Sequence, residues 1–135
     1  MIKDVEALET SCRMSLAEDA LKGIQEFNKG EYYKAHEYLE RAWMEDSSVG
    51  RELYRAILQI AVAYLQIQRG NFRGTMKMFL RARQWIDPLP DTCRGVNVSK
   101  LRHDAYEVHK VISDLGIEGL SEFDSSLLKP VEYVN

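Results

Sequence analysis

Apolar residues recur at helical spacing along most of this chain of 135 residues. The pattern predicts five helices, which we place over residues 15–28, 31–45, 49–69, 71–86 and 97–116. The helix over residues 49–69 leaves only a narrow polar strip, so we expect it at the centre of the fold. No stretch of five or more residues alternates as a half-buried strand would. The pattern therefore predicts an all-α fold, a compact bundle of about five helices.

Residues that favour helix ends mark several of these boundaries. Ser15 followed by Glu18 has the spacing of a capping box, and Asn97 is placed to cap the fifth helix. Gly30 and Gly70 are placed to end helices, because glycine adopts the left-handed conformation at low cost.

An internal similarity links two of the predicted helices. The segment GEYYKAHEYLERA, residues 30–42, aligns with GNFRGTMKMFLRA, residues 70–82, at a spacing of 40 residues. Both segments carry the glycine, aromatic and small residues that are typical of tetratricopeptide helical hairpins. We interpret the similarity as packed antiparallel hairpins of this kind within one domain, residues 1–135. Residues 1–14 are expected to form an arm or a short extra helix, and residues 117–135 an irregular tail.

Composition narrows the partners and the compartment. The net charge of -3 and the pI near 5.6 disfavour nucleic acid, and the richest apolar run, AILQIAVAYLQI, is too short to span a membrane. Cys12 and Cys93 do not form a CxxC pair, and two isolated cysteines fit a reducing cytosol better than a secreted disulfide scaffold. With no apolar segment of a signal peptide at the N-terminus, these features predict a cytoplasmic protein without membrane contacts.

The helix over residues 31–45 contains a candidate chemical pair. His36 and Glu40 are spaced so that their side chains can meet, and both lie at or near the face that carries Leu39 and Trp43. One interpretation is a buried structural pair tied to Gln59, whose removal would destabilise the fold. The other is a general acid–base couple, with or without a metal. The segment HEYLE, residues 36–40, has a glutamate where the zinc motif HExxH has its second histidine, so we expect no metal and no cofactor.

A row of cations marks a candidate docking surface. Residues 67–110 hold nine Lys/Arg and four Asp/Glu, whereas residues 1–66 hold eight and twelve. Arg69, Arg73, Lys77 and Arg81 recur every four residues and form one stripe. The stripe is interpreted either as a solvated helix face or as a docking surface for an acidic partner. It would also suit self-association against the acidic first half of the chain.

Two segments carry a resemblance to a known family. FNKGEYYKAHEYLERAW and LYRAILQIAVAYLQIQRGNFRGTMKMFLRA, between Phe27 and Ala82, resemble DUF309, a family of small helical bacterial and archaeal proteins of unknown function. The resemblance implies a compact helical bundle and no particular activity. Ala56 stands where the family pattern has glycine, and Thr75 where it has alanine. The signature positions fall on Gly30, His36, Glu37, Glu40, Trp43, Gln59, Arg69, Gly70 and Asn71.

Two functions remain open from the sequence. The first is a protein- or peptide-binding or scaffold module, with self-association as an option. The second is a small enzyme that uses His36 and Glu40 as an acid–base pair, with Gln59 and Tyr54 nearby. The candidate binding residues are Glu37, Trp43, Tyr54, Gln59, Arg69, Asn71, Arg73, Lys77 and Arg81.

Overall fold

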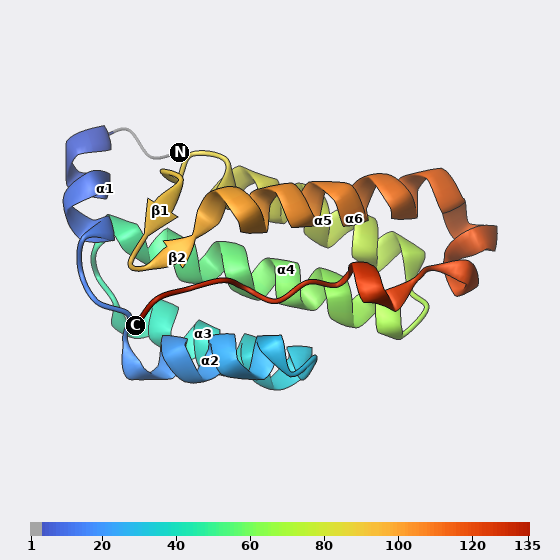
Figure 1. Ribbon diagram of the computed structural model, residues 1–135, viewed down its shortest axis with the longest axis horizontal. Coiled ribbons are helices and arrows are strands. Elements are labelled where there is room, and N and C mark those ends of the chain that lie inside the picture. The colour runs from blue at the N-terminus through green and yellow to red at the C-terminus, as the bar shows by residue number, and fades with distance from the viewer. Residues whose placement is uncertain (1–3) are drawn as a thin grey trace.

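Six α-helices and one small hairpin make up residues 4–135, which are the residues that the computed structural model describes (Figure 1). The helices are α1 Val5–Cys12, α2 Glu18–Asn28, α3 Tyr32–Glu45, α4 Glu52–Gln68, α5 Phe72–Ile86 and α6 Val98–Gly119. Strands β1 Thr92–Cys93 and β2 Val96–Asn97 pair antiparallel, and short 3-10 turns are η1 Val49–Arg51, η2 Leu120–Glu122 and η3 Ser125–Leu127. The predicted all-α class is confirmed.

Helix α4 lies at the centre, as its apolar sequence predicts. It packs against α3 on one side and α5 on the other, while α2 packs against α3 and α6 against α5. Most of its side chains are buried, including Leu53, Ile57, Ile60 and Tyr64, which are fully covered. No helix within residues 4–135 is long and apolar enough to cross a membrane. The tetratricopeptide-like detail of the packing stays a prediction.

The helix ends follow the sequence signals in most cases. Gly30 and Gly70 have φ of 80° and 69°, so the glycines that follow α2 and α4 adopt the expected left-handed conformation. The side chain of Asn97 accepts a hydrogen bond from the Lys100 amide at 3.0 Å and caps α6. The capping box predicted at Ser15 is wrong. Helix α2 begins at Glu18, and the Ala17 amide donates to a distant tyrosine hydroxyl instead.

The β1–β2 hairpin was not expected from the sequence, because its strands are only two residues long. Arg94 and Gly95 form its turn with φ of 51° and 82°. Positive φ at both central residues matches the right-handed twist of paired strands. A left-handed arginine is unfavourable by about 1–2 kcal/mol, so other interactions must hold it there. Arg94 is also 4% exposed, which places its charged side chain inside the protein.

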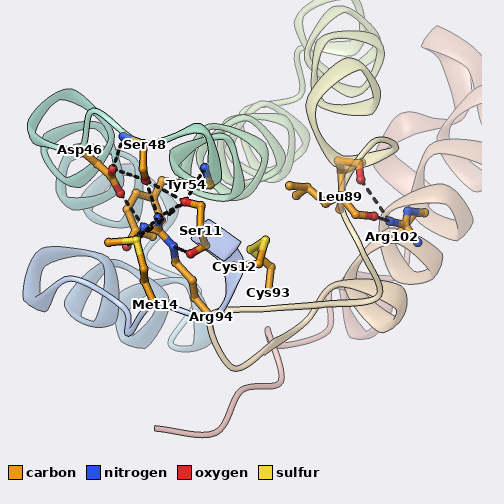
Figure 2. Close-up of a disulfide and its surroundings, with 12 residues drawn as sticks. Ser11, Cys12, Met14, Asp46, Ser48, Tyr54, Leu89, Cys93, Arg94 and Arg102 are labelled. Atoms are coloured by element: carbon orange, nitrogen blue, oxygen red, sulfur yellow. Dashed lines mark hydrogen bonds and ion pairs between the residues drawn. A yellow bond between two sulfur atoms is a disulfide. The ribbon is translucent and has the colours of Figure 1, made fainter. Parts of the chain in front are cut away.

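The two cysteines, expected as separate residues of a reducing cytosol, are joined in a disulfide (Figure 2). Cys12 closes α1 and Cys93 closes β1, 81 residues apart in the sequence. Sequence spacing alone could not show this contact, because it depends on where the hairpin places β1. The pairing removes the reason for expecting a reducing compartment, and the cytoplasmic location stays a prediction.

The guanidinium of Arg94 lies beside the disulfide and joins four segments (Figure 2). It donates to the Asp46 carboxylate at 2.5 Å and to the Tyr54 hydroxyl at 2.9 Å. It also donates to the hydroxyls of Ser11 and Ser48 at 2.8 and 2.7 Å. These contacts connect the hairpin to α1, to the loop before η1 and to α4. The buried charge is therefore both paired and hydrogen-bonded, as a buried charge requires.

The C-terminal segment closes over the opposite side of the hairpin. Val96 and Tyr133 form an isolated antiparallel bridge, and Val131 is 2% exposed. The Asn28 side chain both donates to the Val131 carbonyl and accepts from its amide, at 3.0 and 2.7 Å. Residues predicted as an irregular tail thus dock through turns and backbone pairing, and the residues predicted as an arm include helix α1.

Reduction of the disulfide tests its contribution to the fold. Opening a covalent loop of this length should lower the free energy of unfolding by about 2–5 kcal/mol, because the unfolded chain regains conformational freedom. The measurement is urea unfolding of the wild type with and without reductant. The Cys12→Ser/Cys93→Ser variant is the control and should not respond to reductant. Equal wild-type midpoints in both conditions would contradict the prediction.

The lowered pKa of the Asp46 carboxyl predicts that the protein loses stability in acid. Burial alone would raise the pKa of the Asp46 carboxyl, but hydrogen bonds from Ser48 and Arg94 outweigh it and lower the pKa. The ionised carboxylate therefore stabilises the fold above its unfolded pKa of about 4, and this contribution is lost as pH falls through the folded value. The difference in unfolding free energy between the wild type and Asp46→Asn should shrink below about pH 4. A difference that is constant with pH would exclude this role.

Candidate functional site

His36 and Glu40 form the predicted contact, but at the surface. The distance from His36 Nε2 to a Glu40 carboxylate oxygen is 3.2 Å, and the side chains are 29% and 52% exposed. The prediction of a buried pair is therefore wrong. The buried face of α3 consists of Tyr32, Ala35, Leu39 and Ala42. At about 100° per residue, Glu40 lies about 100° beyond Leu39 and outside that narrow face.

The other predicted partner on α3, Trp43, belongs to a stacked cluster with residues of α4 and α5. The guanidinium carbon of Arg55 lies 4.5 Å from the centroid of the Trp43 ring and 3.7 Å from that of Trp85. The Arg55 guanidinium also contacts the carboxylate of Glu52, with Nε 2.9 Å from Oε2. Trp43 Nε1 donates to the other carboxylate oxygen at 3.3 Å. We call Trp43, Glu52, Arg55 and Trp85 the tryptophan–arginine cluster.

The charges in this cluster are balanced and partly covered. Glu52 is 7% exposed, and a second arginine, Arg51, lies 3.6 Å from its carboxylate and 4.6 Å from the Trp43 ring centroid. Cations over tryptophan faces are attracted by the ring electrons, and more strongly where water is excluded. The cluster therefore fixes α3, α4 and α5 relative to one another. The sequence pattern did not mark Glu52 and Arg55 as site residues, although they are spaced three residues apart on one predicted helix.

Gln59 follows Arg55 by one turn of α4. Its carbonyl oxygen Oε1 is buried and has no hydrogen-bond partner among residues 4–135. Within the same described residues, no hydrogen bond joins Gln59 to His36 or Glu40. The predicted link of that pair to α4 through Gln59 is therefore not formed.

Tyr54, predicted near the histidine, contacts the buried guanidinium of Arg94 instead. Its side chain is fully buried. Its hydroxyl accepts hydrogen bonds from Arg94 and, at 3.1 Å, from the Ala17 amide. These contacts give Tyr54 a structural task at the end of α4 that faces the hairpin.

Three other predicted binding residues lie at a helix end or on the exposed surface of a helix. Asn71 caps α5, because its Oδ1 accepts from the Gly74 amide at 2.9 Å while its amide group donates to Gln66 at 3.1 Å. Arg69 is exposed at the end of α4, and Glu37 is exposed on α3.

The outer face of α5 carries the rest of the predicted stripe and one residue that was missed. Arg73, Lys77 and Arg81 are all exposed, and no ion pair within residues 4–135 involves any of them. Leu80 lies among them and is 62% exposed. At helical spacing, Leu80 follows Arg73 by two turns and therefore shares its face. We call Arg73, Lys77, Leu80 and Arg81 the α5 face.

The described side chains form no cluster that suits a metal. Within residues 4–135, no group of three or more His, Cys, Asp or Glu residues is placed to hold a metal ion. His109 has a lowered pKa because of burial and the nearby Arg83, and its ring stacks on Phe79 at 4.9 Å between centroids. This histidine is therefore part of the α5–α6 contact.

Comparison with known proteins locates the family segment. Residues 20–78 match the model of DUF309, a domain of unknown function, which confirms the predicted resemblance over that segment. A relative from Aquifex aeolicus (strain VF5), described as an uncharacterized protein, is 29% identical over 83 residues. The match covers 61% of this chain and 25% of the relative, so the chain spans about a quarter of the relative's length. Trp85, Arg81 and Arg94 lie beyond the family segment.

The tryptophan–arginine cluster and the His36–Glu40 pair should contribute differently to stability. Arg55→Ala should cost about 1–3 kcal/mol, because it leaves the buried Glu52 carboxylate with fewer partners and unpacks two tryptophans. His36→Ala and Glu40→Ala should each cost less than about 1 kcal/mol, as exposed ion pairs do. Urea unfolding of the three variants, with Arg81→Ala as an exposed-arginine control, measures the order. A Glu40→Ala variant as unstable as Arg55→Ala would contradict the structure.

Proposed function

We propose that this chain, whose residues 20–78 match the DUF309 model, is a protein-binding module that docks an acidic segment of its partner on the α5 face. The observation that carries the proposal is the exposed Leu80 among three cations that have no ion pair within residues 4–135. An apolar residue gives a partner something to bury, and the cations select its charge.

The α5 face has the composition of a recognition surface. Protein interfaces commonly combine apolar side chains with a polar rim, and Leu80 beside Arg73, Lys77 and Arg81 offers both kinds of group. The arginines can bind carboxylates in a bidentate manner, which adds geometric selectivity to charge. Trp85 continues the same helix one turn after Arg81, and tryptophan and arginine are the residues most often found at binding hot spots.

The charge of the whole chain favours a protein partner over nucleic acid. The net charge is -3, so the cations of the α5 face are a local feature of an acidic protein. A nucleic-acid interface usually extends positive charge over a larger surface, because each phosphate contact adds to affinity. The exposed Leu80 of this face also suits an apolar side chain better than a phosphate backbone.

A second candidate function is catalysis by His36 and Glu40. The observation that favours it is their contact at 3.2 Å on a partly exposed part of α3, where a substrate can reach the imidazole. The pair would act as a general acid–base couple. The docking proposal is preferred because the α5 face offers exposed apolar surface and unpaired charge together.

Charge reversal on the α5 face tests the docking proposal. Arg73→Glu/Lys77→Glu should reduce capture of protein partners from a cell lysate by about tenfold or more, a loss of roughly 1.4 kcal/mol of binding free energy. The thermal midpoint should stay nearly unchanged, because exposed charges contribute little to folding. Capture is measured by quantitative mass spectrometry on immobilised protein at low and moderate salt.

The matched control for that experiment is Lys34→Glu/Lys110→Glu. Both lysines are exposed on other helices, and the substitution changes the net charge by the same amount. Partners of the α5 face should be retained by this control, lost by the α5 variant and weakened by salt. Equal capture by the wild type and the α5 variant would remove the α5 face from the proposal.

A further inference from the structure

We propose that the α5 face binds a second copy of this chain, at an acidic groove between helix α1 and turn η1 that we call the α1 groove. The inference rests on the proposed function and names its partner. It would make the protein a module that associates head to tail, with one surface of each kind on every copy.

The α1 groove is an open hollow of about 580 Å³ between helix α1 and turn η1. Ala7, Met14 and Val49 give it apolar walls. Asp4 and Glu6 stand at its margin, and both are exposed. Met14 is 51% exposed, so the apolar wall is open to a partner side chain. The groove thus combines an apolar floor with a negative rim.

The α5 face has the complementary character. Its apolar residue, Leu80, projects from the surface, whereas the apolar residues of the α1 groove surround a hollow. Its charged residues are all cations, whereas the charged residues that line the α1 groove, Asp4 and Glu6, are both acidic. One cation, Arg13, follows α1 and donates to the Thr10 hydroxyl of the groove at 3.2 Å. A leucine that enters the groove would therefore bring the flanking cations toward Asp4 and Glu6. Complementary potentials of this kind fix orientation and exclude wrong pairings.

The α1 groove is held in shape before any partner arrives. The disulfide fixes the end of α1 to β1. The Ser11 hydroxyl, on the groove wall, accepts from the Gly50 amide at 2.9 Å and from Arg94 at 2.8 Å. A preformed surface loses little conformational freedom on binding, which favours association.

The α5 face and the α1 groove of one copy cannot contact each other. Figure 1 shows α1 at one end of the molecule and α5 running along its length, well away from α1. Contact between the two surfaces must therefore join different copies through different patches, which is a heterologous interface. Such an interface leaves one free surface at each end of a dimer, so it extends to longer assemblies or closes into a ring.

Two variants that each disable one surface give a decisive test. Glu6→Gln/Thr10→Arg alters the α1 groove, and Leu80→Ser/Arg81→Gln alters the α5 face. All four positions are exposed, so the fold should be retained, which circular dichroism and thermal unfolding check. Sedimentation velocity of the wild type, from micromolar to millimolar concentration, should show mass that rises with concentration and falls with salt. Each variant alone should associate at least about tenfold more weakly.

The mixture of the two variants supplies the decisive outcome. The intact α5 face of the first can bind the intact α1 groove of the second, so the mixture should form a complex of two chains and no larger species. The control Lys34→Glu/Lys110→Glu should assemble as the wild type does. A wild type that stays monomeric, or assembly that persists in either variant, would overturn the inference.

The same variants separate this inference from the proposed function. If the wild type is monomeric while the α5 variants still lose a captured protein and the groove variant keeps it, the α5 face binds a different acidic partner. If the α5 variants lose neither capture nor self-association, the docking proposal itself is wrong.

Discussion

The N-terminal part of the fold depends on the ion pair and the hydrogen bonds that the buried guanidinium of Arg94 makes. Its side chain is 1% exposed, and it lies in a left-handed turn that arginine adopts only at a cost. Burial of the charge is tolerated because Asp46 neutralises it and hydroxyls or carbonyls accept its remaining protons. The accepting groups lie on three segments, namely α1, the loop before η1 and α4, so the arginine sets where those segments meet. The disulfide at the preceding residue fixes the same junction covalently.

Helix α4 connects this junction to the other polar cluster. Tyr54 and Arg55 are neighbours in sequence, yet one contacts Arg94 and the other is stacked between two tryptophans. Successive helical residues point about 100° apart, so one turn of α4 reaches two separate polar groups. A guanidinium is central to each group, which suits a planar cation that combines stacking with several hydrogen bonds. The remaining sides of α4 are left to apolar packing, and the helix stays at the centre.

The sequence predicted what depends on local pattern and missed what depends on distant contact. The helices and the ends at Gly30, Gly70 and Asn97 follow from spacing and backbone preference, which neighbouring residues determine. The pairing of Cys12 with Cys93 depends on how a hairpin docks, and no periodic pattern records that. The contact of His36 with Glu40 was predictable from spacing, but its exposure depends on how wide a face α3 buries. Leu80 was not predicted as a surface residue, because a leucine in a helix is expected to be buried, whereas Leu80 is exposed.

The disulfide has a topological consequence for the family segment. It closes a covalent ring from residue 12 to residue 93, and this ring contains the whole of residues 20–78. A protease that cuts one peptide bond anywhere inside the ring does not divide the oxidised protein into two molecules. The cut chain keeps its mass apart from one added water, and its helices remain tethered at both sides of the nick. Only reduction would separate the pieces, so the segment is protected against the loss of any fragment by a single cleavage.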